Sequence, residues 1–222
     1  LGLLAEPGLG QRNLAEQTVA AVIERWGGSG YTDAVAGRLK SADSVAVKAS
    51  FMRVLAKLGN SRAMDILLDA LDEGNAEIRG VAVRMLSQWP TAAPLEELFS
   101  IAREDDSEKM RILALRGVIR MIALNTGRGV QETMHLYQEA LKLASRPQEK
   151  RRIISGLGDV SSPESLELVM TFLSDSVLRR EAATAAIEIA EGIVKSHSDI
   201  AGKAMQAIRD RTENPEVQRR AT

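Results

Sequence analysis

One short pattern recurs six times along the 222 residues of this chain, and the repetition restricts its fold more than any other feature. Each copy starts with a polar residue and continues with an apolar, a basic and a small residue, as in 75–82 and 107–114. The residues at the basic position or its equivalent are Lys48, Arg79, Arg111, Arg151, Arg179 and Gln218. The intervals between them average 34 residues, enough for two short helices and two turns. The sequence therefore predicts an array of helix pairs.

Apolar residues follow a helical period within each copy. Counted from the basic position, they stand at −1, +3, +6, +7 and +10. These offsets fall within one arc of a helix that turns about 100° per residue. In the first copy they are Val47, Phe51, Val54, Leu55 and Leu58. One apolar stripe per helix has to be covered by a neighbouring helix, so we expect the copies to stack.

Start and stop signals place both helices of each pair. The copies form the second helices, over 44–58, 75–89, 107–123, 147–157 and 176–191. The first helices are predicted at 61–73, 92–104, 130–144 and 161–173. Gly59 and Gly158 are typical of helix ends, and the serines at 61 and 161–162 of helix starts. We also expect an N-terminal helix over 13–25 and the opening of a further second helix at 214–222.

These helix pairs resemble HEAT repeats over roughly residues 31–222. More specifically, 51–59 and 152–158 resemble HEAT segments of large multidomain bacterial proteins. The resemblance implies an all-α fold, a right-handed α-α superhelix of the HEAT/armadillo-like solenoid type with five to six helix pairs. Residues 1–30 would be an N-terminal capping region, continuous with a single solenoid domain over 31–222. Because the numbering begins at Leu1, we expect a fragment of a longer chain.

Composition narrows the function without naming it. Aromatic residues make up only 3% and hydrophobic residues 45%, so small aliphatic side chains must fill the interior. A net charge of −1 gives no overall attraction to nucleic acid or to an anionic membrane. No apolar run approaches the roughly 20 residues that span a bilayer, so no membrane insertion is expected. The absence of cysteine fits a reducing or an oxidising compartment, and the localisation stays open.

Charge separates between the two kinds of helix. The predicted first helices sum to −8 and the second helices to +8. Second helices commonly line the concave face of HEAT repeats, so the resemblance implies a basic inner surface. Positions +5 and +9 lie about 40° apart and opposite the apolar stripe. In the first three copies they hold Arg53, Lys57, Arg84, Gln88, Arg116 and Arg120.

We hypothesise that this row of side chains binds an acidic peptide or protein domain, with the arginines making charge-assisted contacts. The alternative is a solvated face whose charges pair within their own helices. The basic position itself, at Arg79, Arg111 and Arg179, borders the apolar stripe and is interpreted as structural.

A second function class is a nucleic-acid-binding solenoid, which would resemble the HEAT-like DNA glycosylases. Neutral overall charge and few aromatics argue against it. A duplex-DNA shift assay at low salt separates this class from peptide binding.

Little in the sequence suggests catalysis. Glu132 and His135 have the spacing of a di-iron helix motif, but a second such pair is missing from the sequence. Acidic clusters at 72–73, 96–97 and 104–106 are interpreted as solvated helix ends. The glycines of 27–30 and 156–158 lack the Lys-Ser/Thr of a phosphate loop and are interpreted as helix caps. We therefore expect no enzyme, no cofactor and no metal site.

Overall fold

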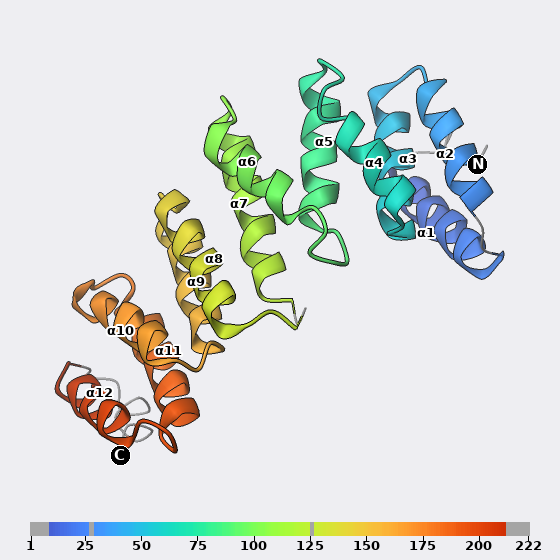
Figure 1. The fold of residues 1–222 in the computed structure, drawn as a ribbon. Coiled ribbons are helices and arrows are strands. Elements are labelled where there is room, and N and C mark those ends of the chain that lie inside the picture. The colour runs from blue at the N-terminus through green and yellow to red at the C-terminus, as the bar shows by residue number, and fades with distance from the viewer. Residues whose placement is uncertain (1–8, 27–28, 125–126, 212–222) are drawn as a thin grey trace. The chain divides into compact units, whose positions relative to one another are not determined.

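The computed structural model describes residues 9–26, 29–124 and 127–211 (Figure 1). Over these residues the chain forms twelve α-helices, one short 3-10 helix and no strand, which confirms the predicted all-α fold. The helices are α1 (Leu9–Trp26), α2 (Ser29–Lys40), α3 (Val45–Leu58), α4 (Ser61–Asp69), α5 (Ala76–Ser87), α6 (Leu95–Glu104), α7 (Glu108–Ile122), α8 (Val130–Leu143), α9 (Pro147–Gly158), α10 (Pro163–Met170), η2 (Thr171–Ser174), α11 (Arg179–Ile193) and α12 (Ser198–Arg211).

The predicted helices are present, with differences mainly at their ends. The first helices start up to three residues later than expected, as α6 does after Pro94. The last of them is α10, and its final turn tightens into η2. The N-terminal helix α1 is longer than the predicted range of 13–25. The helix opening expected at 214–222 lies outside the described residues.

The chain divides into two compact units, unit 1 (Leu1–Gly117) and unit 2 (Val118–Thr222). In unit 1, α3 packs against α1, α2, α4 and α5. In unit 2, α11 packs against α9, α10, η2 and α12, and α8 packs against α9. The sequence predicts a different division, between a capping region at 1–30 and a solenoid over 31–222, and this division stays a prediction.

The apolar stripe of the repeated helices forms the core of unit 1. Phe51, Val54 and Leu55 of α3 are buried, and so are the corresponding side chains of α5. Trp89, just after α5, is only 2% exposed. These residues confirm the helical period that the sequence predicts, because the same offsets are buried in successive copies. The side chain of the other tryptophan lies outside the described residues.

Two predicted caps have different outcomes. Gly59 ends α3 in the left-handed conformation with φ of 61°, and Asn60, not the predicted Ser61, caps α4 by accepting from Ala63 N–H at 2.9 Å. Gly158 does not cap α9: it is the last helical residue, and Asp159 follows as the cap. A Cβ on Gly158 would lie 2.5 Å from the Glu188 carboxylate. The cap interpretation of 156–158 is therefore wrong, because these glycines serve close packing.

Candidate functional site

The basic residues of the repeated position join successive copies in unit 1. Lys48 Nζ lies 3.5 Å from Glu73 Oε2, in the loop before α5. Arg79 pairs with Asp105, in the loop before α7. Arg111 donates to the backbone carbonyl of Asp105 at 2.5 Å. These contacts agree with the structural interpretation of Arg79 and Arg111, since both hold a loop to a helix.

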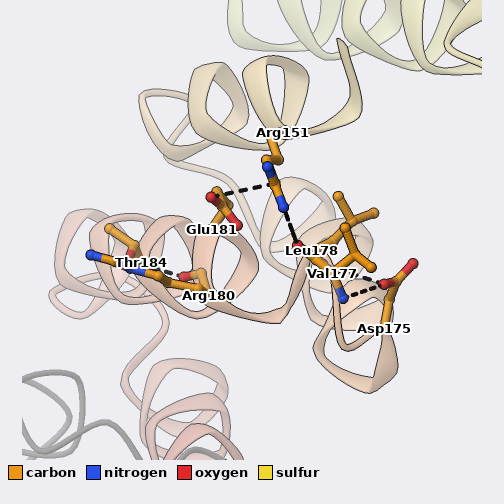
Figure 2. Close-up of polar contacts among 7 residues, drawn as sticks. All are labelled: Arg151, Asp175, Val177, Leu178, Arg180, Glu181 and Thr184. Carbon is orange, nitrogen blue, oxygen red and sulfur yellow. Dashed lines mark hydrogen bonds and ion pairs between the residues drawn. The ribbon is translucent and has the colours of Figure 1, made fainter. Parts of the chain in front are cut away.

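In unit 2 the same position holds Arg151, which joins α9 to the loop before α11 and to α11 itself (Figure 2). We call these contacts the Arg151 clasp. Arg151 of α9 donates to the Val177 carbonyl from Nε at 3.4 Å and from Nη2 at 3.1 Å. Its Nε also lies 3.6 Å from Glu181 Oε1 on α11. Asp175 holds the loop by accepting from Val177 N–H at 2.8 Å. Arg179 donates from Nε to a backbone carbonyl of the preceding turn at 2.9 Å, so it is structural as predicted.

One acidic residue departs from its predicted environment. The sequence predicts that 104–106 is a solvated helix end, yet the side chain of Asp105 is only 4% exposed. It accepts from Arg79 and, through Oδ1, from Ser107 N–H at 2.8 Å. The prediction is wrong for Asp105, because Arg79, 26 residues earlier in the chain, supplies the opposite charge that a buried carboxylate requires.

The proposed binding side chains differ in whether they already have hydrogen-bond or ion-pair partners within the chain. Arg53 is 3.0 Å from Glu16 of α1, a carboxylate whose side chain is 6% exposed. Lys57, Arg84 and Gln88 are exposed, and their side chains form no hydrogen bond or ion pair with the described residues. Lys57 and Arg84 are therefore available to a ligand, while Arg53 is already paired.

The remaining two proposed residues lie on α7. Arg116 is half-buried and Arg120 is exposed, and each takes part in an interaction of its own. Arg116 belongs to unit 1 and Arg120 to unit 2. Whether the six side chains form one continuous row stays a prediction.

A groove of about 260 Å³ in unit 1 brings two of the proposed arginines together. We call it the basic groove, and its lining residues are Arg53, Ala76, Glu77, Gly80, Val81, Arg84, Met85, Lys109, Met110 and Leu113. Three basic side chains and one carboxylate thus line the groove together with apolar side chains. A Cβ on Gly80 would lie 3.1 Å from Met110 Cε, so the glycine lets this methionine approach α5. Such a surface suits a ligand with acidic and apolar groups.

Lys109 and Glu77 line the groove without having been predicted. Both stand at offset −2 from the basic position of their copies. At about 100° per residue, −2 lies within roughly 20° of +5 on the helix surface. The helical arithmetic that selected +5 and +9 could therefore have found them, had it been extended one turn toward the N-terminus.

Other candidate sites stay separate from the groove. Glu132 and His135 are exposed on α8. Residues 9–26, 29–124 and 127–211 contain no group of three or more His, Cys, Asp or Glu side chains that could hold a metal ion. Within the same ranges, no helix combines the length and the apolar character needed to cross a membrane.

Comparison with known proteins addresses the fold. A family model described as HEAT repeats matches residues 32–119. No curated protein matches the chain. A solved structure of human deoxyhypusine hydroxylase in complex with glycerol is similar, with 16% identity and a TM-score of 0.41, covering 99% of this chain and 91% of that one.

The similar structure corrects one prediction. Deoxyhypusine hydroxylase is an enzyme, so the expectation that this chain is not an enzyme is contradicted and is withdrawn. At this identity and TM-score, the similarity assigns no reaction and no substrate to the chain. The family match and the helix pairs agree on the architecture: residues 32–119 match HEAT repeats, and the described residues form an all-α fold consistent with a HEAT-like α-solenoid.

Proposed function

We propose that the chain is a helical-repeat scaffold whose basic groove binds an acidic segment of a partner protein. The observation that carries the proposal is that the side chains of Arg84 and Lys109 are exposed at the groove and unpaired among the described residues, with no hydrogen bond or ion pair to any of them. Two cations beside an apolar surface can bind carboxylates with little loss of existing contacts.

The lining of the groove also favours a ligand with apolar groups. Met85, Met110 and Leu113 line it together with the basic side chains. Methionine adapts its shape to a partner because it is unbranched and flexible. The segment bound here would therefore alternate acidic and apolar side chains.

The other predicted residues have graded roles in this proposal. Lys57 and Gln88 stand one helical turn beyond Arg53 and Arg84, where they can contact the partner outside the groove. Arg53 contributes less than Arg84, because Glu16 already compensates its charge. Arg116 and Arg120 also contribute less, since each has an intramolecular interaction.

The test is a charge reversal in the groove. Fluorescence anisotropy measures the binding of a labelled peptide that alternates Glu and Leu to wild type and to Arg84→Glu/Lys109→Glu. We expect affinity to fall by about tenfold or more and to weaken with salt. The matched control is Arg38→Glu/Lys40→Glu on α2, which changes net charge equally at exposed positions and should retain binding within about threefold.

Three results contradict the proposal. One is equal affinity of the wild type and the groove variant for the acidic peptide. Another is equal binding of a control peptide with Lys in place of Glu. The third is binding of duplex DNA without binding of the acidic peptide, which would favour the nucleic-acid class.

A further inference from the structure

A second cavity lies in unit 2, away from the residues of the proposed function. Its volume is about 390 Å³, within the range of small-molecule sites. The last turn of α7, the first half of α8 and the end of α9 surround it. Its polar side chains come from Arg128, Thr133, Tyr137 and Asp159, and Gly127 and Gly156 also line it.

Tyr137 is the feature that distinguishes this cavity from an ordinary surface hollow. The residue is 2% exposed, and its hydroxyl forms no hydrogen bond with any described residue. A Cβ on Gly156 would lie 2.2 Å from the hydroxyl oxygen, so the hydroxyl rests on the bare backbone of α9. A tyrosine hydroxyl that lines a cavity and has no hydrogen bond within the protein can donate one to a ligand there.

Charges of both signs face the same hydroxyl. Burial, together with the negative charge of Asp159, raises the pKa of Tyr137 to about 12, and Arg128 opposes the change. The hydroxyl therefore stays protonated at neutral pH. Arg128 and Asp159 both line the cavity, so a cation and an anion lie beside it.

The end of α9 adds to the negative side. Asp159 follows α9 as its C-terminal cap and lines the cavity. Helix C-termini carry partial negative charge and attract cations. At the end of α7, Arg128 Nη2 donates to the Met121 carbonyl at 2.7 Å, which holds the guanidinium there and offsets the partial negative charge of that helix end.

We propose that this cavity binds a small zwitterionic molecule of amino-acid or dipeptide size. The ammonium group lies toward Asp159 and the C-terminus of α9, the carboxylate lies toward Arg128, and the Tyr137 hydroxyl hydrogen-bonds the ligand. A purely anionic ligand would face Asp159, and a purely cationic one would face Arg128. A zwitterion satisfies both groups, and its size matches the volume of the cavity.

The test is calorimetric titration of the intact chain with L-alanyl-L-alanine and L-glutamine. Two blocked probes, N-acetyl-L-alanyl-L-alanine and L-alanyl-L-alanine amide, remove one charge each. We expect binding of at least one zwitterion, and about tenfold or more loss when either of its charges is blocked. Asp159→Asn should weaken binding by a similar factor.

Tyr137→Phe keeps the test independent of folding. Since its hydroxyl has no partner among the described residues, the variant should fold as stably as wild type, yet bind the zwitterion about three- to tenfold more weakly. Tyr31→Phe, at an exposed tyrosine of unit 1, is the matched control and should bind normally. The groove variant Arg84→Glu/Lys109→Glu should also bind normally, which separates this site from the proposed function.

Three outcomes overturn the inference: no heat of binding from either zwitterion, equal affinity for the blocked probes, or unchanged affinity of Tyr137→Phe.

Discussion

Ion pairs between elements stand out in unit 1, and close packing of small residues stands out in unit 2. Each unit has an example of the other kind: Arg151 pairs with Glu181 in unit 2, and a Cβ on Gly117 of unit 1 would lie 2.7 Å from Ser87 Cα. In unit 1, charged side chains span between elements in four ion pairs: Arg53–Glu16, Arg62–Asp33, Lys48–Glu73 and Arg79–Asp105. In unit 2, small residues bring helices close. The buried alanines of α11 are Ala182, Ala183, Ala185, Ala186 and Ala190. Glycines meet tyrosine, glutamate and serine side chains at 156, 158 and 192.

The difference predicts what each unit tolerates. Long charged side chains adjust to small displacements. Losing one member of a buried ion pair destabilises the fold, because the other charge is left uncompensated. Closely packed glycine and alanine tolerate almost no added volume. We therefore expect unit 1 to be sensitive to charge removal and unit 2 to be sensitive to added methyl groups.

The largest effect is expected from Asp105→Ala in unit 1. It leaves Arg79 without its carboxylate and also removes the acceptor for Ser107 N–H. We expect the free energy of unfolding to fall by about 2–4 kcal/mol, measured by urea denaturation followed by circular dichroism. Asp106→Ala is the matched control, because this neighbouring residue is exposed, and it should cost less than about 0.5 kcal/mol. Equal losses from the two variants would remove the special role of the buried pair.

Gly156→Ala should produce the next effect and tests the packing of unit 2. The added Cβ would lie 2.2 Å from the hydroxyl oxygen and 2.6 Å from Cζ of Tyr137, which is itself buried. We expect a loss of about 1–3 kcal/mol in the same denaturation experiment. Gly202→Ala in α12, where a Cβ would meet nothing within 4 Å, should instead stabilise by up to about 1 kcal/mol. Stabilisation by both alanines would contradict the close packing.

Arg151→Ala measures how much the Arg151 clasp of unit 2 stabilises the fold, in comparison with the buried Arg79–Asp105 pair of unit 1. Arg151 and Glu181 have side chains 43% and 33% exposed, so solvent screens their attraction (Figure 2). We expect a loss of about 0.5–1 kcal/mol, smaller than that of Asp105→Ala. Raising the salt concentration should reduce the contribution of the ion pair, while the hydrogen bonds to Val177 remain. A loss as large as that of Asp105→Ala would contradict the expectation that solvent exposure makes the Arg151–Glu181 pair weaker than the buried Arg79–Asp105 pair.

The last prediction concerns alkaline pH, where the size of the effect depends on the pH chosen. The folded state keeps Tyr137 protonated up to a pKa of about 12, whereas the ordinary value is 10.0. Between these values the unfolded state loses the proton first, so the stability contributed by Tyr137 is complete below pH 10 and declines as the pH rises toward 12. Unfolding of wild type and Tyr137→Phe across this window should show the extra decline only in wild type. Parallel curves would contradict the burial of a protonated hydroxyl.

The candidate site was only partly predictable. Offset +5 pointed to Arg84, which lines the basic groove, and the same arithmetic would reach Lys109, because both depend on position around a single helix. It could not show that Arg53 has a partner, since Glu16 stands 37 residues earlier in the chain. The hydroxyl of Tyr137 was unpredictable for the same reason: its cavity depends on Gly156 in another helix.

The sequence by itself determined the helix pairs, their period and the buried face of each helix. These features follow from regular spacing along one helix, as Phe51, Val54 and Leu55 illustrate. The tertiary structure alone decided which charges are paired and where cavities remain. Ion pairs and voids form between residues distant in the chain, and their energies depend on distance and burial, which no local pattern records.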